Sequence, residues 1–228
     1  MINNKIKILL LFIKTITSYG IINSIKIIFF EILGLIILRD VKSLSYSDEN
    51  SSSYLDSKKL KKYNVPYIPT PYYFLYLIKN FLLTLNFKRI NLIDIGCGYC
   101  RPAKYLSTKF NITFAGVELD TNISNEIIKE KNKNFKIYNF DLRNIKKTSL
   151  FFNKNIKANT NNLLLLSDTV EIDLINKILN KIKNKSKITL VLINTKYKKL
   201  NIKNFKITKK ILFKHHLKNI IFLENNIK

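Results

Sequence analysis

Acidic residues are scarce in this chain, and several stand where chemistry is expected. The sequence has 15 Asp and Glu against 40 Lys and Arg in 228 residues. Four of the acids end or closely follow a short apolar run: Asp94, Glu118, Asp141 and Asp168. If these runs are parallel strands, their carboxyl ends share one edge of a sheet, where open α/β sheets bind ligands. The alternative is that each acid caps the next helix, which fits Asp120 before Thr121 best.

A glycine-rich turn follows the first of these acids. Gly96 and Gly98 allow a tight turn in which the backbone comes close to a ligand, and the helix behind it offers free N–H groups. Glu118 comes twenty residues after Gly98, at the end of the next apolar run. A carboxylate in that place can accept hydrogen bonds from both hydroxyls of a ribose. The turn and the spaced acids together predict a nucleotide-like ligand.

From residue 90 onward, short apolar runs alternate with helical patterns, which is typical of βαβ units in a parallel sheet with helices on both faces. The predicted strands are Ile90–Ile95, Ile112–Glu118, Phe135–Phe140, Leu163–Leu166 and Ile188–Ile193. The predicted helices are Arg101–Phe110, Ile123–Lys131, Asn144–Phe152 and Ile172–Lys183. Two more strand-like runs, Phe205–Leu212 and Leu217–Leu223, leave no room for a helix between them and predict a closing antiparallel hairpin.

The chain before residue 90 has a different character. Residues 1–45 are strongly apolar and predict an N-terminal helical extension, with helices at Ile6–Ile16 and Ile21–Leu38 broken at Ser18–Gly20. Residues 46–65 are Ser-rich and charged and predict a linker. Residues 66–228 form the main domain, which begins with a helix from Pro71 to about Leu85 capped by Thr70.

The motifs at the predicted sheet edge resemble those of the class I S-adenosylmethionine-dependent methyltransferases, over about residues 66–223. The resemblance implies a Rossmann-like sheet of seven mostly parallel strands, S-adenosyl-L-methionine as cofactor, and transfer of its methyl group to an acceptor that the sequence does not name. The matching segments are Asn91–Cys100, Gly116-Val-Glu118, Phe140-Asp141-Leu142, and Leu163–Leu166 with Ser167-Asp168.

The resemblance also implies roles for single residues. Asp94, Gly96, Cys97 and Gly98 would lie near the methionine end of the cofactor, and Glu118 would hold its ribose.

Four further residues complete the implied site. Asp141 and the Leu142 amide would bind the adenine, whereas Ser167 and Asp168 would border the reactive methyl group. Asp168 is the candidate catalytic base if the acceptor must lose a proton; a cap on the next helix is an equal alternative. No metal ion is implied.

Other interpretations compete with the methyltransferase. Cys100 stands where the family often has a third glycine, and the absence of an Asn-Pro-Pro-Tyr pattern argues against its amino-methylating DNA and glutamine enzymes. Cys97 and Cys100 form a C-x-x-C pair that would suit a redox protein, and a dehydrogenase would need glycine at Arg101. A methyltransferase-like module without catalysis, serving in binding or at a membrane, is the non-enzymatic alternative.

The net charge of +25 favours anionic partners, but Ile, Lys and Asn together make up 102 residues, so a composition bias explains much of it. Only 4 of the 40 basic residues are Arg, which does not favour nucleic acid.

Two cysteines and no good signal peptide predict a cytoplasmic protein. No stretch gives a secure transmembrane helix. The apolar N-terminal segment either packs on the domain or attaches peripherally to an anionic membrane surface, and its Ser-rich connector favours the membrane slightly.

Overall fold

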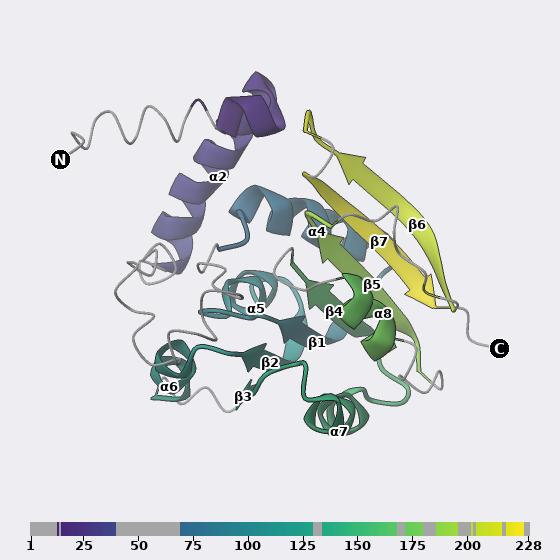
Figure 1. Ribbon diagram of the computed structural model, residues 1–228. Coiled ribbons are helices and arrows are strands. Elements are labelled where there is room, and N and C mark those ends of the chain that lie inside the picture. The colour runs from purple at the N-terminus through teal and green to yellow at the C-terminus, as the bar shows by residue number, and fades with distance from the viewer. Residues whose placement is uncertain are drawn as a thin grey trace.

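The computed structural model describes residues 13, 15–39, 69–129, 134–167, 172–179, 186–195, 202, 204–215 and 218–225. They form one seven-stranded sheet in the order β3-β2-β1-β4-β5-β7-β6 (Figure 1). Only β7 runs antiparallel to its neighbours, so the predicted mostly parallel sheet with a closing hairpin is confirmed. The strands are β1 Arg89–Ile95, β2 Asn111–Glu118, β3 Phe135–Asn139, β4 Asn162–Leu166, β5 Ile188–Ile193, β6 Phe205–Leu212 and β7 Asn219–Asn225.

Helices cover both faces of the sheet, as the alternating pattern predicts. The helices are α2 Ile21–Leu38, α4 Tyr72–Thr84, α5 Arg101–Leu106, α6 Thr121–Lys129, α7 Ile145–Asn155 and α8 Ile172–Leu179. Side chains of α4, α5 and α6 pack in one apolar core, whereas those of α7 and α8 pack in a second core on the opposite face. Strand β1 supplies both cores, because Ile90 and Leu92 face the first and Ile93 and Ile95 the second.

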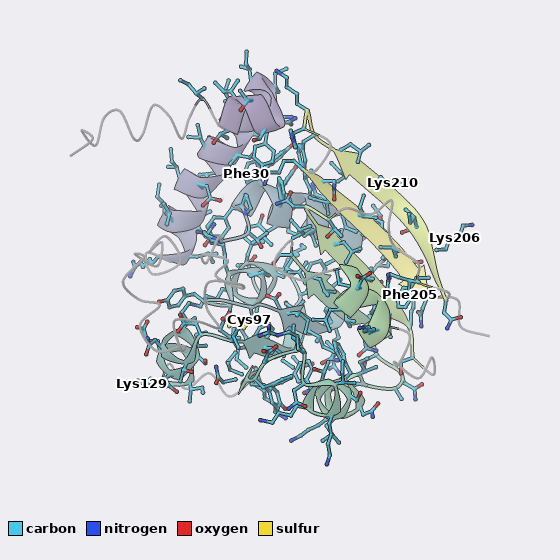
Figure 2. The ribbon with its side chains drawn as sticks, in the orientation of Figure 1. Phe30, Cys97, Lys129, Phe205, Lys206 and Lys210 are labelled. Atoms are coloured by element: carbon cyan, nitrogen blue, oxygen red, sulfur yellow. The ribbon has the colours of Figure 1, made fainter. Side chains whose placement is uncertain are left out.

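The order in which successive strands are added to the sheet reverses between β1 and β4. From β1 the chain continues to β2 and β3 on one side, and β4, β5 and the hairpin lie on the other. The carboxyl ends of β1 and β4 therefore flank the topological switch point, where such sheets leave a crevice for ligands. Strand β6 closes the far edge, where exposed Lys206 and Lys210 (Figure 2) discourage pairing with another chain.

The N-terminal helix α2 is a second layer outside the first core, next to α4 (Figure 1). The predicted break before it is confirmed, since Gly20 precedes α2 with a φ of 81°. Phe30 of α2 packs against the rings of Tyr73 and Tyr76 of α4, with centroid distances of 5.5 and 4.6 Å. Gly34 allows α2 to approach α4, because a Cβ there would lie 2.2 Å from the Tyr72 ring.

The expected cap of α4 is wrong in its residue. The helix begins at Tyr72, its N-cap position is Pro71, and no side chain at that position caps it. Instead, the Glu31 carboxylate of α2 accepts a hydrogen bond from the Tyr72 N–H at 2.7 Å. A carboxylate at a helix N-terminus also meets the positive end of the helix dipole, so the distant acid replaces the local Thr70 cap.

Helix α5 ends at Leu106, before the predicted end at Phe110. The predicted ends of the next two helices, Lys131 and Lys183, lie outside the described residues. Asp120 does cap α6, since its Oδ1 accepts from the N–H groups of Asn122 and Ile123. The predicted linker at 46–65, most of the predicted helix Ile6–Ile16, and Asp168 lie outside the described residues.

Candidate functional site

The glycine-rich turn after β1 is held against the end of β2. The N–H groups of Gly96 and Cys97 donate to the Val117 carbonyl at 2.9 and 3.0 Å. Gly96 and Gly98 have φ angles of 75° and 48°, in the left-handed region that glycine adopts without strain. The sequence thus places glycine at two positions of the turn whose backbone conformation favours it.

Glu118 joins this turn to the next one. Its Oε2 accepts from the Gly98 N–H at 2.8 Å, and its Oε1 accepts from the Asp120 N–H at 2.9 Å. Burial raises the pKa of Glu118 above its usual range, although these backbone hydrogen bonds oppose the rise. Each carboxylate oxygen can accept a second hydrogen bond, so Glu118 both orders the loop and keeps acceptor capacity for a pair of hydroxyls.

Asp94 is the most unusual group in the site. Its side chain is 4% exposed, and its buried Oδ2 has no hydrogen-bond partner. Burial, together with the nearby Glu118 charge, raises the pKa of Asp94 to about 8. A buried acceptor without a partner costs about 1–3 kcal/mol, and a structural carboxylate would gain nothing from that cost. Asp94 is therefore the residue whose environment points most directly to a ligand.

A small pocket lies beside Asp94, at the carboxyl ends of β1 and β4. Its volume is about 20 Å³, which is room for about one water molecule. The predicted site residues Asp94, Gly96, Cys97 and Ser167 come together here, with further lining from Thr70, Arg101, Pro102 and Leu165. A nucleotide-sized ligand therefore has to displace part of this lining.

The sequence analysis did not predict that Arg101 and Glu31 pair in this region. Arg101 is 1% exposed, and its guanidinium forms an ion pair with Glu31 at 2.8 Å and donates to the Thr70 carbonyl at 3.2 Å. The guanidinium also lies over the Tyr72 ring, 4.3 Å from its centroid. Their rarity could have pointed to them, because the chain has only four Arg and Glu31 is the only charged residue in Ile27–Leu38.

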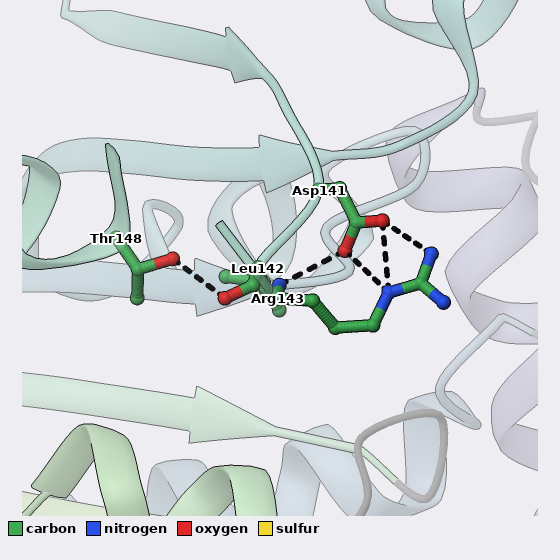
Figure 3. A network of polar contacts seen from close by, with 4 residues as sticks. All are labelled: Asp141, Leu142, Arg143 and Thr148. Atoms are coloured by element: carbon green, nitrogen blue, oxygen red, sulfur yellow. Dashed lines mark hydrogen bonds and ion pairs between the residues drawn. The ribbon is translucent and has the colours of Figure 1, made fainter. Parts of the chain in front are cut away.

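Asp141 and Leu142 lie beyond the end of β3, apart from the pocket lining. The Asp141 carboxylate forms a two-pronged ion pair with the Arg143 side chain and accepts from its N–H at 2.9 Å (Figure 3). These bonds lower the pKa of Asp141. The Leu142 carbonyl accepts from the Thr148 hydroxyl at 2.8 Å, which fixes the turn before α7. The Asp141 carboxylate, which the sequence predicts to bind adenine, thus already has a partner within the chain.

The two cysteines are buried and reduced. Both side chains belong to the first apolar core, and Cys97 is labelled in Figure 2. A hydrogen bond with Cys100 and burial raise the pKa of the Cys97 thiol, which is the opposite of what a redox-active C-x-x-C needs. Cys100 precedes α5 in the left-handed conformation, with a φ of 59°. Within the described ranges, no group of three or more His, Cys, Asp or Glu side chains could hold a metal ion.

The chain matches known proteins in structure but not in sequence. No family model matches, and no curated protein does. Among solved structures, the chain is similar to the candidate methyltransferase yhhF of Escherichia coli, with a TM-score of 0.50, 10% identity, and coverage of 67% of this chain and 85% of that one.

Two other solved structures are similar at lower scores. A methyltransferase from Clostridium acetobutylicum has a TM-score of 0.43 and 11% identity, over 66% of this chain and 89% of that one. Magnesium protoporphyrin IX methyltransferase from Synechocystis, solved with its cofactor bound, has a TM-score of 0.43 and 11% identity, over 66% and 76%. With the strand order described above, the likeness to the Escherichia coli protein establishes that this chain has the fold of the class I S-adenosylmethionine-dependent methyltransferases.

Proposed function

We propose that the protein binds S-adenosyl-L-methionine at the carboxyl ends of β1 and β2 and transfers its methyl group to an acceptor. The observation that carries the proposal is the buried Asp94 Oδ2, which has no hydrogen-bond partner and borders the pocket. A cofactor with an ammonium group and a sulfonium supplies both a donor and a positive charge for such an oxygen. The residues present therefore fit this cofactor.

Each predicted residue then has a task. Asp94, with the turn of Gly96, Cys97 and Gly98, holds the methionine end, and Glu118 accepts hydrogen bonds from the ribose hydroxyls. The support for Glu118 is its place at the end of β2, with both oxygens next to the glycine turn.

The remaining residues bind the adenine and border the reacting atoms. Asp141 and the Leu142 amide bind the adenine, which requires Asp141 to share its carboxylate with Arg143. Ser167 and Asp168 border the reactive methyl group.

The protein contributes alignment and exclusion of water. The cofactor supplies a methyl group that is already a strong electrophile. The turn at Gly96–Gly98 and the buried Arg101 hold the walls of the pocket in place, so the acceptor meets the methyl group in line and away from water. Asp168 takes a proton from the acceptor where one must leave.

A second candidate is a methyltransferase-like module without catalysis. Two observations favour it: the pocket has a volume of about 20 Å³, and Asp141 is already paired with Arg143. The two candidates differ in cofactor binding, because the module needs none. The same titration therefore separates them.

The test is isothermal calorimetry with S-adenosylmethionine at pH 7, in phosphate and in Tris. Because the pKa of Asp94 is about 8, most free chains hold a proton there at pH 7. A cationic ligand lowers that pKa, so binding should release up to about one proton, and the binding enthalpy should differ between the two buffers. Asp94→Asn should abolish the buffer dependence and weaken binding at least about tenfold.

Two variants serve as controls. Glu118→Gln should weaken binding about tenfold through the ribose. Glu126→Gln, which makes the same change on the exposed side of α6, should leave binding unchanged. Absence of heat with the unmodified protein would favour the module without catalysis.

A further inference from the structure

We propose that α2 is a membrane-docking helix, which lies in the headgroup region of an anionic bilayer with its outer face toward the lipid. The proposal does not rest on the proposed methyl transfer. It rests on three features of α2: an inner face committed to the protein, an outer apolar face with no protein partner among the described residues, and a positive border.

The inner face of α2 packs against the domain. Glu31 binds both the Tyr72 N–H and the Arg101 guanidinium, and Phe30 packs on the α4 tyrosines. Gly34 lies against the Tyr72 ring with no space for a larger residue. The face of α2 toward the protein is therefore fixed, which leaves the opposite face pointing outward.

The outer face is a continuous apolar stripe. Its members recur at steps of three and four residues, which places them on one side of a helix. Each is more than half exposed: Ile22, Ile25, Phe29, Ile32 and Ile36. Elsewhere in the described chain, exposed apolar side chains such as Leu83, Ile128 and Leu150 lie on three different helices. Contiguous apolar surface of this kind marks an interaction site, whereas isolated residues do not.

The charge around the stripe selects anionic lipid as the occupant. The only acidic residue of α2 is Glu31, and it points inward to Arg101, so the outer face of α2 carries no carboxylate. Lys26 and Arg39 are exposed on the helix and at its end.

The β6–β7 turn adds further positive charge at the start of α2. The turn is joined there by the bond from the His215 N–H to the Ser18 carbonyl. Lys214 lies next to Gly20, and the Lys218 ammonium lies 5.8 Å from the Tyr19 ring centroid. A second copy would bring another +25 chain to this positive border, which like-charge repulsion opposes. Anionic headgroups instead attract it.

The helix lies along the membrane rather than across it. By length and composition, its 18 residues could cross a bilayer. However, the Glu31–Arg101 ion pair and the contacts with α4 hold α2 against the domain along its inner face. A crossing helix would have to break this partly buried ion pair, leaving the buried Arg101 charge unpaired, or take α4 and α5 into the hydrocarbon, at a large cost. An amphipathic helix in the interface keeps both sets of contacts.

Docking in this way brings the candidate pocket toward the lipid. Arg101 lines the pocket and is bound directly by Glu31 of α2. One helix diameter, about 10 Å, therefore separates the lipid-facing side of α2 from a residue of the pocket wall.

The test is vesicle flotation of the full chain at low salt. Phosphatidylcholine vesicles with about 30% phosphatidylserine are compared with phosphatidylcholine alone. We expect the protein to float with the anionic vesicles, at least about tenfold more than with the neutral ones, and to be released in 0.5 M salt. The variant Ile25→Glu/Ile32→Glu, which leaves the inner face untouched, should lose at least about tenfold of the binding.

The matched control is Ile128→Glu/Leu150→Glu, which makes the same changes at exposed apolar residues of α6 and α7. It should float like the unmodified protein, and circular dichroism should show both variants folded. The proposal is overturned if the unmodified protein stays in the soluble fraction, or if the control loses as much binding as the α2 variant. It is also overturned if the α2 variant instead converts a dimer into a monomer in light scattering, because a second copy then covers the stripe.

Discussion

The two ends of the β1–β4 strand pair place polar side chains in opposite situations. At the amino end, Asn91 pairs in register with Asn162, and both are buried. Asn91 Nδ2 donates to Asn162 Oδ1 and to the Asn155 carbonyl, each at 2.7 Å. Asn162 Oδ1 also accepts from the Lys157 N–H, and its Nδ2 donates to nearby carbonyls. At the carboxyl end, Asp94 is equally buried, but one of its oxygens has no partner.

The difference separates an end that is satisfied within the fold from the end at which we propose that a ligand binds. Neutral amides donate and accept, so the amino end satisfies its buried polar atoms within the fold. A buried carboxyl oxygen without a hydrogen-bond partner is costly in either protonation state, unless something outside the chain supplies that partner. The amino end, where Asn91 and Asn162 bond to each other and to nearby backbone (the polar lock), is thus closed. The carboxyl end at Asp94 is open, because one oxygen there lacks a partner.

The largest effect is expected from breaking the closed end. Asn162→Ala removes a fully buried amide and takes away the acceptor of the Lys157 N–H and of one of the two bonds that Asn91 Nδ2 donates. We expect the free energy of unfolding to fall by about 4 kcal/mol, measured by urea denaturation. The partly exposed neighbour is the control, and Asn161→Ala should cost less than about 1 kcal/mol. Equal losses for the two variants would contradict the polar lock.

The open end should make stability depend on pH. The pKa of Asp94 is about 8 in the folded chain, above the usual 3.8, so the folded state holds the proton more tightly. The resulting stabilisation is complete below about pH 4 and is lost as pH rises toward 8. The stability of Asp94→Asn relative to the unmodified protein should therefore rise by at least about 2 kcal/mol between pH 5 and pH 9. Thermal melts across this range measure it.

A control separates this effect from the general loss of a negative charge. Glu126→Gln on exposed α6 should run parallel to the unmodified protein at every pH. If Asp94→Asn shows the same slope as the unmodified chain, Asp94 is not the titrating group.

A third change, Gly116→Ala, acts on the open end from the neighbouring strand β2. Gly116 pairs in register with Asp94, and a Cβ at Gly116 would lie 2.6 Å from Cys97 Sγ and 2.8 Å from Phe114 Cζ. Gly116→Ala should cost about 1.5 kcal/mol through overpacking and should weaken cofactor binding by shifting the turn. Cys97→Ala in the same chain should restore part of the stability in urea titrations. No recovery would mean that Phe114, rather than the turn, takes up the clash.

The smallest effect is expected at Cys100. Its left-handed backbone favours glycine by about 1 kcal/mol, whereas its buried thiol contributes packing of similar size. Cys100→Gly should therefore change stability by less than about 1 kcal/mol and leave cofactor binding intact. Cys100→Val should be clearly worse, because a branched side chain is poorly tolerated in this conformation. If both variants behave alike, backbone conformation does not select this residue.

The sequence alone determined the elements and the turn. Alternation of apolar runs identified all seven strands, and β5 and β6 have the predicted bounds. The positions of Gly96 and Gly98 and the capping role of Asp120 were also predictable. These features are local, because side-chain periodicity, positive φ angles and helix caps each depend on a few neighbouring residues.

Only the tertiary structure decided how distant residues meet. Glu31 caps α4 from 41 residues away and pairs with Arg101 from 70 residues away, so no periodic pattern in the sequence marks either contact. Asp94 and Asp141 look alike in sequence, each following or ending an apolar run. In the fold, Asp141 is bound by Arg143, whereas Asp94 is buried without a partner for its Oδ2. Burial and pairing are set by which elements pack together in space, and that packing gives one carboxylate a neighbour and leaves the other open.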